Sequence, residues 1–321
     1  MARVAVFLNP GADLDASIAL AQRADAVGYE SIWVTHGIVG REALLVLGAY
    51  GHVAPRAGLG TGVLPIYPRH PVLLAQEAMT LSELSRGRLR LGIGVSHEPA
   101  MTRGLGLDMG RPLDVMREYV TVLRAALDGH VEHAGPRYRV SWRSGLLKPP
   151  PAPPILLAGL GPKMLELAGE IADGAVLWLC SPAYIRDHAL PAIRRGRARA
   201  GKALDGFEVV AAVPAALTVD RPAGLALFKA ELVRYLQLPF YRAMLEGSGF
   251  AADLAAFDTA PGAASVSDRL VGALGAVGDF TEVARFVASH REAGVTLPAV
   301  RPIGFPDAGH YLPTLEAGIN S

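Results

Sequence analysis

Residues 57–97 read AGLGTGVLPIYPRHPVLLAQEAMTLSELSRGRLRLGIGVSH. An apolar run, Ala57–Val63, is followed by a segment with helical periodicity, Pro71–Ser85, and then by a second apolar run, Leu89–Val95. Both runs are short and almost wholly apolar, which is typical of strands buried on both faces of a parallel sheet. The stretch therefore predicts a strand, a crossover helix and a second, parallel strand.

The same alternation extends along the rest of the chain. The predicted strands are Val4–Leu8, Ser31–Thr35, Ala57–Val63, Leu89–Val95, Pro154–Ala158, Gly174–Leu179, Phe207–Thr218 and Leu297–Ile303, and the predicted helices between them are Asp13–Val27, Arg41–His52, Pro71–Ser85, Pro112–Leu127, Pro162–Ala172 and Ala183–Ala200. Repeated units of this kind predict a (β/α)8 TIM barrel. Because α/β barrels reach 321 residues as one folding unit, we expect a single domain over residues 1–321.

Two stretches are too long to be plain connections between a strand and a helix. Gly129–Pro153 contains a Pro cluster, and the alternation in Tyr138–Trp142 indicates a strand or a hairpin. Ala223–Gly278 exceeds the length of one connection and predicts extra helices before a closing helix near Thr281–Ala293. We expect an insertion after the fourth helix and extra helices after the seventh strand.

Composition narrows the class of partner. Lysine and arginine number 31 and the acidic residues 30, so the chain lacks the basic excess of a nucleic-acid-binding protein. The single cysteine, Cys180, cannot form an intramolecular disulfide, and no Cys/His spacing typical of a metal site is present. No apolar run reaches membrane-spanning length. We expect a cytoplasmic protein that binds a small molecule, without a nucleic-acid or membrane partner and without a metal.

The active site of an α/β barrel lies at the carboxyl ends of its strands. Residues that end or follow the predicted strands are therefore the first candidates for function. They are Asn9, His36, Gly62, Val63, Val95, Ser96, His97, the loop Gly159–Lys163, and Cys180 with Ser181.

The segment ILLAGLGPKMLEL, Ile155–Leu167, runs from a strand through two glycines into a helix that Pro162 opens. Glycines allow close approach of a ligand to the backbone, and a helix start favours an anion through its free N–H groups and dipole. Lys163 would add a charge-assisted contact. The alternative is a tight turn whose glycines and proline only satisfy backbone geometry. The segment is neither a P-loop nor a GxGxxG fingerprint.

His36 and His97 follow strands that point into the same mouth, and histidine exchanges protons near neutral pH. They are the candidates for a catalytic acid/base pair, with Glu98 as a substitute or an orienting group for His97. The alternative is that both rings only hydrogen-bond to the backbone.

The run IYPRHP, residues 66–71, offers one candidate for a pocket wall. Tyr67 fits that role, whereas Arg69 and His70 are expected to cap or brace the loop and Pro71 to open the next helix. Cys180 is a second candidate for the substrate pocket. It lacks an obvious activating partner, so we expect its thiol to be inert.

The stretches GTGVLPIYPRHPVLLAQEAMTLSELSRGRLRLGIGVSH, residues 60–97, and LAGLGPKMLELAGEIADGAVLWL, residues 157–179, resemble the luciferase-like monooxygenase superfamily. FLNP near the start, GIGVSH, AGLGPKML and QLPFYRAML are similar to its actinobacterial branch, which depends on the deazaflavin coenzyme F420. The resemblance extends from Phe7 to Leu245 and so covers most of the chain.

The resemblance implies that the coenzyme ring stacks against an irregular third strand with a non-prolyl cis peptide, here Gly62–Val63. The coenzyme-binding residues that it implies, together with the helix-start argument above, are Asn9, Gly62, Val63, Val95, Ser96, Ala158, Gly159, Leu160, Gly161, Pro162 and Lys163. The chain departs from the sugar-phosphate dehydrogenases of this branch. They carry adjacent Asp and His after strand two and Glu after strand four, whereas this chain has Thr35–His36 and Ser96–His97.

These observations predict an F420-dependent oxidoreductase that transfers a hydride between the deazaflavin and a small organic substrate. Two alternatives stay open: an FMN-dependent two-component monooxygenase on the same fold, and a non-catalytic protein that binds a flavin or deazaflavin. A homodimer is expected, because the exposed helices of such barrels often pack against a second copy.

Overall fold

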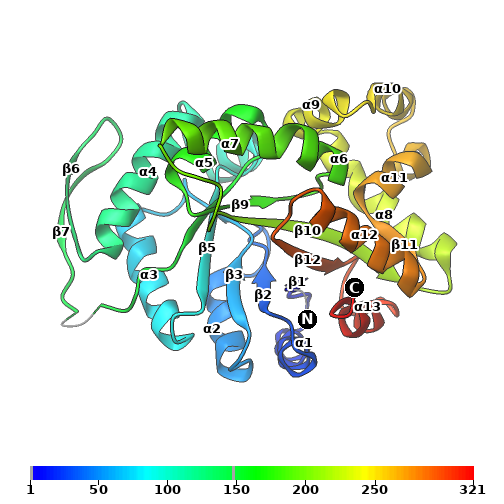
Figure 1. The fold of residues 1–321 in the computed structure, drawn as a ribbon, viewed down its shortest axis with the longest axis horizontal. Helices are drawn as coiled ribbons and strands as arrows, with labels where there is room; N and C mark the ends of the chain where they lie inside the picture. The colour runs from blue at the N-terminus through cyan, green and yellow to red at the C-terminus, as the bar shows by residue number, and fades with distance from the viewer. Residues whose placement is uncertain (1–2, 147–148) are drawn as a thin grey trace.

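The computed structural model describes residues 3–146 and 149–321, in which parallel strands form a closed barrel surrounded by helices (Figure 1). The barrel strands are β1 (Ala5–Leu8), β2 (Ser31–Val34), β3 (Gly58–Thr61) continued by β4 (Leu64–Pro65), β5 (Leu89–Gly94), β8 (Ile155–Ala158), β9 (Gly174–Leu177), β10 (Glu208–Leu217) and β12 (Leu297–Pro302). β1 pairs with β12, and β10 pairs with both β9 and β12, so the sheet closes on itself. The predicted (β/α)8 barrel is confirmed.

Helices pack around the outside of the barrel. They are α1 (Leu14–Val27), α2 (Ala43–Val53), α3 (Pro71–Leu84), α4 (Pro112–Leu127), α5 (Pro162–Ile171), α7 (Leu190–Arg199), α12 (Phe280–Glu292) and α13 (Tyr311–Gly318). Local signals explain several starts: Asp13 caps α1, His70 caps α3, and Asp279 with Glu282 forms a capping box at α12. In the described residues, no helix combines the length and apolar character needed to cross a membrane.

Two helix predictions need correction. The predicted helix Ala183–Ala200 is divided into α6 (Pro182–Tyr184), a π-helical turn (Ile185–Ala189) and α7, because Pro191 lacks the N–H that would continue the regular ladder. Helix α13 was not predicted. Its N-terminal residue, His310, makes no side-chain cap, so the sequence lacks the usual start signal.

Both predicted additions to the barrel are present. The insertion after α4 is an antiparallel hairpin of β6 (His130–Ala134) and β7 (Arg139–Arg143), at the left of Figure 1. The additions after β10 are α8 (Arg221–Leu236), α9 (Pro239–Gly247), α10 (Ala251–Thr259), α11 (Asp268–Leu274) and the short strand β11 (Ala276–Gly278). Strand β11, which was not predicted, pairs with the carboxyl end of β10.

A row of glycines on β3 makes room for aromatic rings inside the barrel. A Cβ atom on Gly60 would lie 2.2 Å from Cδ2 of Trp33, and one on Gly62 would lie 2.1 Å from Cε1 of Phe7. Trp33 and Phe7 are almost fully buried in the barrel interior. Since β3 contributes no side chains here, the two rings fill the space at the density of a protein core.

The third strand is irregular where the resemblance predicted it. Gly60 pairs with Arg90, but Leu64 pairs with Ile93, so four steps along the third strand oppose three along β5. One extra residue is therefore bulged out, and the Gly62–Val63 peptide bond is cis, as predicted. Gly94 accommodates the bulge, since a Cβ atom there would lie 2.8 Å from Cγ2 of Val63.

Ion pairs close the amino-terminal end of the barrel. Arg90 on β5 contacts Glu208 at 2.7 Å and also pairs with Glu30, while Arg3 contacts Glu208 at 2.6 Å. These ion pairs occupy the amino-terminal end, whereas active sites of such barrels lie at the opposite, carboxyl ends of the strands. This end therefore reads as structural.

Candidate active site

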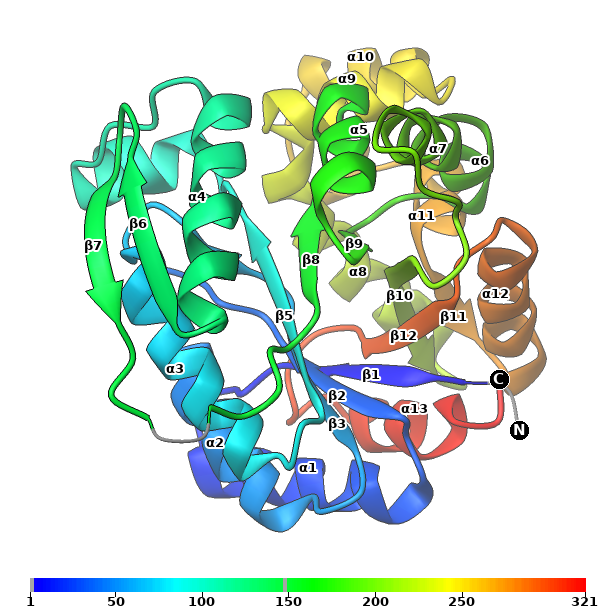
Figure 2. The same cartoon turned by 60° about the vertical axis from the view of Figure 1, so that its left-hand side comes forward.

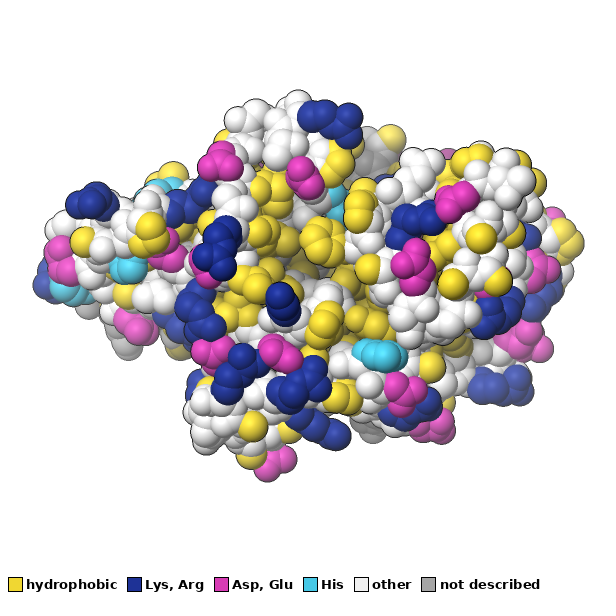
Figure 3. Space-filling model, turned by 90° about the horizontal axis from the view of Figure 1, so that it is seen from above, with side chains coloured by type: hydrophobic (Ala, Val, Ile, Leu, Met, Phe, Trp, Pro, Cys, Tyr) yellow, Lys and Arg dark blue, Asp and Glu magenta, His cyan; other side chains and the backbone are white. Residues whose placement is uncertain are grey.

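The carboxyl ends of the strands open on one side of the molecule. β5 and β8 point toward the top of Figure 2, and Figure 3 looks down on that side. Hydrophobic side chains gather there in a central hollow, with charged side chains around it (Figure 3). We refer to this side, formed by the loops after the barrel strands, as the mouth.

His36 lies in the loop between β2 and α2 and is mostly buried. Its Nδ1 accepts a hydrogen bond from the backbone N–H of Ala43 at 3.3 Å, so the neutral ring carries its proton on Nε2. Burial, and then the positive charge of Arg69, lower the pKa of His36, while Glu42, 3.7 Å away, acts in the opposite direction. Near neutral pH the ring is therefore a neutral Nε2–H donor.

His97 follows β5 and faces a different part of the mouth. Its ring lies against Tyr241 of α9, with 5.9 Å between the ring centroids. Burial, and then the charge of Arg234 on α8, lower the pKa of His97. The two predicted catalytic histidines thus have different surroundings: His36 lies beside an acidic and a basic side chain, and His97 lies beside aromatic rings.

Unusual backbone conformations occur at two strand ends of the mouth. Ser96 after β5 has φ of 62°, and Leu179 after β9 has φ of 53°. Residues other than glycine seldom adopt this left-handed conformation, and where they do, the position is often functional. Ser96 was predicted to bind the coenzyme. Leu179 was not singled out, because nothing in its residue type signals such a conformation.

The start of α5 is open to a ligand. Gly161 is its N-terminal residue, no side chain caps the first turn, and a Cβ atom on Gly161 would meet nothing within 4 Å. The neighbouring loop is held from behind, since the Tyr184 hydroxyl donates to the Leu160 carbonyl, and Lys163 is exposed. Uncapped N–H groups beside open space fit an anion better than a turn that only satisfies its own backbone.

Asn9 directly follows β1, and the NH₂ group of its side-chain amide is free to bind a ligand in the mouth. Its backbone N–H donates to the Tyr311 hydroxyl at 2.9 Å, and its Oδ1 accepts from the N–H of Gly11 at 3.0 Å. The side-chain NH₂ of Asn9 is not needed for this turn, so it could donate to a ligand.

Tyr67 and Cys180, the predicted pocket walls, are both buried. The guanidinium of Arg137 lies 5.3 Å from the centre of the Tyr67 ring, and the Tyr67 hydroxyl has no hydrogen-bond partner among the described residues. The Cys180 thiol packs 3.7 Å from the Met244 sulfur, and burial raises the pKa of this thiol to about 12. Cys180 is therefore an inert thiol near neutral pH, and its place in a substrate pocket stays a prediction.

The mouth also contains a charged pair that the sequence analysis missed. Arg301 on β12 faces the barrel interior in register with Leu297 and Ala299, and its guanidinium lies 5.3 Å from the centre of the Trp178 ring. Its Nη1 donates to Glu231 of α8 at 3.1 Å, but its Nε has no acceptor among the described residues. An arginine in the otherwise apolar run LPAVRP was the signal that could have revealed it.

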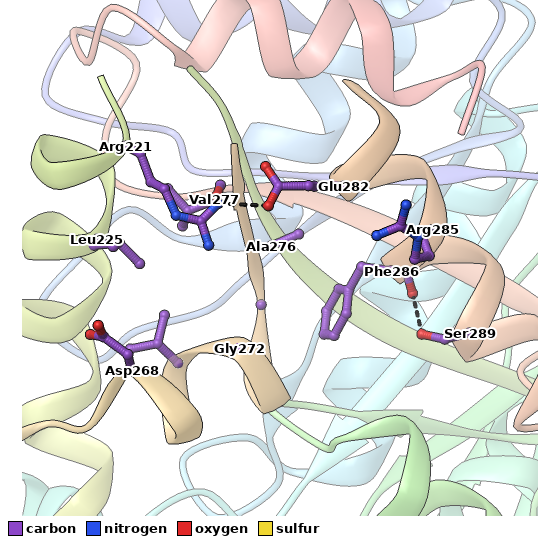
Figure 4. A pocket seen from close by; sticks show the side chains of 12 residues that line it. Arg221, Leu225, Asp268, Gly272, Ala276, Val277, Glu282, Arg285, Phe286 and Ser289 are labelled. Carbon is purple, nitrogen blue, oxygen red and sulfur yellow. Dashed lines mark hydrogen bonds and ion pairs between the residues drawn. The ribbon is translucent and has the colours of Figure 1, made fainter. Parts of the chain in front are cut away.

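A second hollow, of about 350 Å³, lies between α8, α11, β11 and α12 (Figure 4). Arg221 donates to Glu282 and to the carbonyl of Val277, both at 2.7 Å, and the Phe286 ring forms part of the wall. None of the predicted site residues lines this hollow. Arg221 thus fastens the start of α8 to α12 by an ion pair and to β11 by a hydrogen bond, which is a structural task.

Comparison with known proteins identifies the family. The family model described as luciferase-like monooxygenase matches residues 1–297. The chain belongs to the luciferase-like monooxygenase family. Among relatives, this luciferase-like chain is 30% identical over 299 residues to a 5,10-methylenetetrahydromethanopterin reductase from Archaeoglobus fulgidus, a match that covers 88% of each chain.

Solved structures share the fold of this luciferase-like protein. The coenzyme F420-dependent tetrahydromethanopterin reductase from Methanopyrus kandleri has a TM-score of 0.85 at 22% identity, covering 98% of this chain and 96% of that chain. The oxygenating constituent of 3,6-diketocamphane monooxygenase from Pseudomonas putida, solved with FMN, has a TM-score of 0.73 at 18% identity, covering 99% and 97%. At these identities the likeness concerns the fold alone.

Proposed function

We propose that this luciferase-like protein is an F420-dependent oxidoreductase that acts on a small organic substrate. The observation that carries the proposal is the one-residue bulge at Gly62–Val63, which presents backbone and the Val63 side chain at the mouth. In the sequence the bulge lies between His36 and His97. Beside it along the barrel lies the uncapped start of α5. A flat ring system on the bulge with an anionic side chain at the helix start would fit this arrangement.

The residues that would hold the coenzyme belong to these two features and to the strand ends between them. We assign the ring to Gly62, Val63, Val95 and Ser96, the side chain to Ala158, Gly159, Leu160, Gly161, Pro162 and Lys163, and a polar contact to Asn9. Ala158 lies next to Gly94 and so joins the bulge to the helix start: a Cβ atom on Gly94 would be 3.2 Å from that of Ala158. The coenzyme would thus lie along one wall of the mouth.

The bound deazaflavin supplies hydride transfer at its C5 position. The protein then has to orient the substrate and move a proton on the substrate heteroatom, because a carbon that gains or loses a hydride changes the basicity of that heteroatom. The Nε2–H of His36 is free to donate a hydrogen bond to that heteroatom, since Nδ1 is engaged with the backbone of Ala43, and His97 is then the candidate that takes up or supplies the proton. The rings of Tyr241, Tyr235 and Trp178 form a connected aromatic wall beside His97.

The choice of F420 rests on the relatives, whereas the fold alone admits FMN as well. The Methanopyrus kandleri reductase is F420-dependent by name, and the 3,6-diketocamphane monooxygenase was solved with FMN. We extend the first of these to this chain because the relative that is 30% identical over 88% of each chain, from Archaeoglobus fulgidus, is also named as a methanopterin reductase. A cytoplasmic location and a homodimer remain part of the same proposal.

Parallel titration of the purified protein with F420, FMN and NADPH tests the proposal. We expect F420 to bind at least about tenfold more tightly than FMN, a difference of about 1.4 kcal/mol, and NADPH to bind weakly. Tighter binding of reduced FMN, together with oxygen consumption in the presence of substrate, would instead identify a monooxygenase. Tight binding of F420 with no turnover across a broad substrate panel would identify a binding protein.

Gly161→Val tests the helix start as the anion site. We expect it to weaken F420 binding about tenfold or more, because its side chain would occupy the space that the anion needs, while an ordinary φ of −77° and open surroundings let the barrel fold. Gly159→Val should also weaken binding, and Lys163→Ala should cost less, since Lys163 is exposed. Coenzyme fluorescence gives the dissociation constants.

Gly145→Val is the matched control, because Gly145 is exposed, lies beyond the hairpin and also has open space at its Cβ position. It should bind F420 like the unmodified protein. Unchanged affinity in all three variants of the helix start would remove this segment from the site.

A further inference from the structure

A groove of about 520 Å³ lies between the loop that follows β4 and the turn of the β6–β7 hairpin. Six residues line it: Tyr67, Arg69 and His70 from the loop, and Arg137, Tyr138 and Arg139 from the hairpin. None of these lining residues is acidic. The groove therefore presents three guanidinium groups, of which Arg69 is paired with Glu42 and Glu77, whereas Arg137 and Arg139 have no carboxylate partner within the described residues.

The acidic side chains closest to the groove already have partners. Asp108, whose charge acts on the Tyr67 hydroxyl and whose backbone carbonyl accepts from Arg137, uses its carboxylate to accept the N–H of Gly110. Glu42 and Glu77 both pair with Arg69, on the side of the loop that faces α2 and α3. The carboxylate of Glu118 accepts the backbone N–H groups of Arg137 and Tyr138, which fixes the hairpin turn. These carboxylates hold the walls of the groove in place and do not fill it.

Several hydrogen-bond donors at the groove have no acceptor. Arg139 is exposed, and its guanidinium has neither a hydrogen bond nor an ion pair within the described parts of the chain. Tyr67 is only 8% exposed, and its buried hydroxyl has no hydrogen-bond partner among the described residues. Burial raises the pKa of this hydroxyl to about 12, so it keeps its proton and remains a donor near neutral pH. Unpaired buried donors are uncommon and call for a partner.

His70 adds a donor of fixed direction. Its Nδ1 accepts from the N–H of Val72 at 3.3 Å, and burial lowers the pKa of His70, so the neutral ring carries its proton on Nε2. The ring is held edge-on against Tyr138, with 5.5 Å between centroids. The polar groups of the groove are thus almost all donors, which matches a ligand that offers only acceptors.

The groove adjoins the mouth through a chain of charged contacts. Arg69 pairs with Glu42, and the same Glu42 oxygen lies 3.7 Å from Nδ1 of His36. Tyr67 follows the bulged strand by two residues. A ligand whose reacting part lies in the mouth could therefore extend over this rim into the groove.

We propose that the groove between the loop after β4 and the hairpin turn binds the carboxylate or phosphate groups of a ligand. Arginine forks match the oxygen geometry of both groups. The inference rests on the proposed function in one respect, namely that the rest of the ligand lies in the mouth. The anion belongs either to the side chain of the coenzyme or to the substrate, and these share the chemistry that the groove recognises.

Calorimetric titration with inorganic pyrophosphate, at constant ionic strength, tests the groove without any turnover. We expect measurable binding that Arg139→Gln weakens about fivefold to tenfold, because a charge-assisted contact is lost. The control is Arg143→Gln on the same strand and the same exposed side of the hairpin, which does not line the groove. Both variants lower the net charge by one, so only the groove position differs.

A second titration identifies the source of the anion. The unmodified protein and Arg139→Gln are each titrated with F420 and with a deazaflavin chromophore that ends at the ribityl chain and lacks phosphate and carboxylates. If Arg139→Gln weakens the binding of F420 but not of the chromophore, the groove holds the coenzyme side chain. If the affinity for neither ligand changes, the groove holds an anionic group of the substrate. Absent pyrophosphate binding, or equal weakening by both variants, would overturn the proposal. Failure of F420 to bind while pyrophosphate binding persists would count against the proposed function and leave the groove standing.

Discussion

Replacing His36 by alanine is expected to lower turnover about 10²–10⁴-fold and to leave coenzyme affinity nearly unchanged. The ring is fixed by the N–H of Ala43 with its Nε2–H free to donate, so its loss removes a hydrogen bond to the reacting heteroatom without removing a wall of the coenzyme site. His97→Ala is expected to fall in the same range, with His36 the stronger of the two. Steady-state kinetics with the true substrate, together with fluorescence titration of F420, separate the two effects.

The pH profile gives the same prediction a second readout. His97, as the ring that would accept a proton, works in its neutral form, and burial lowers its pKa below the ordinary value of about 6.5. In the direction of substrate oxidation the rate should therefore have reached its plateau at pH 7 and should decline only below about pH 6.5. His97→Ala should lose this dependence, whereas His36→Ala, which removes a hydrogen-bond donor, should keep it.

His52→Ala is the control, because His52 is exposed on α2 and takes no part in the mouth. It should retain full turnover. If His36→Ala, His97→Ala and the double variant all turned over at the normal rate, neither ring would carry the proton, and water or another loop would have to supply it.

Gly60→Ala is expected to destabilise the barrel by about 1–3 kcal/mol or more, or to prevent folding. The new methyl group would lie 2.2 Å from Cδ2 of Trp33, a ring that is fully buried in the barrel interior and cannot move away without disturbing its neighbours. Urea unfolding followed by far-ultraviolet circular dichroism measures the change. Trp33→Leu in the same chain should recover part of the loss, since the two positions share one space.

Gly48→Ala provides the matched control within α2. A Cβ atom on Gly48 would meet nothing within 4 Å, and alanine favours a helix interior over glycine by about 0.5–1 kcal/mol. The same substitution should thus stabilise at residue 48 and destabilise at residue 60. Equal unfolding midpoints for the two variants would show that the ring of Trp33 does not require the glycine.

The glycines of the third strand carry two requirements at once. Gly62 was predicted to lie beneath the coenzyme ring, and it also faces Phe7 so closely that no Cβ atom fits between them. Loss of coenzyme binding in a Gly62 variant would therefore not by itself prove a contact with the coenzyme. Gly161 is the sharper probe, because nothing in the protein crowds it.

Local pattern was sufficient to predict the barrel and much of the mouth. Apolar runs with flanking helix signals marked the eight barrel strands to within a few residues, since burial on both faces imposes the same composition on each. The resemblance added the irregular third strand, and the paired registers of β3, β4 and β5 confirm its bulge. His36 and His97 were selected as candidates because each lies within a few residues of a strand end, and their catalytic role stays a prediction.

What the sequence by itself determined was the order of strands and helices, and hence which residues reach the mouth, because that information lies in periodicity and in caps a few residues apart. Only the tertiary structure decided the partners: Arg69 and Glu42 beside His36, Arg301 over Trp178, and the hairpin arginines beside Tyr67. Apart from His36 and Glu42, which lie in one loop, these pairs join segments far apart in the chain. Their contact energies depend on distances that closure of the barrel sets, and no local pattern encodes them.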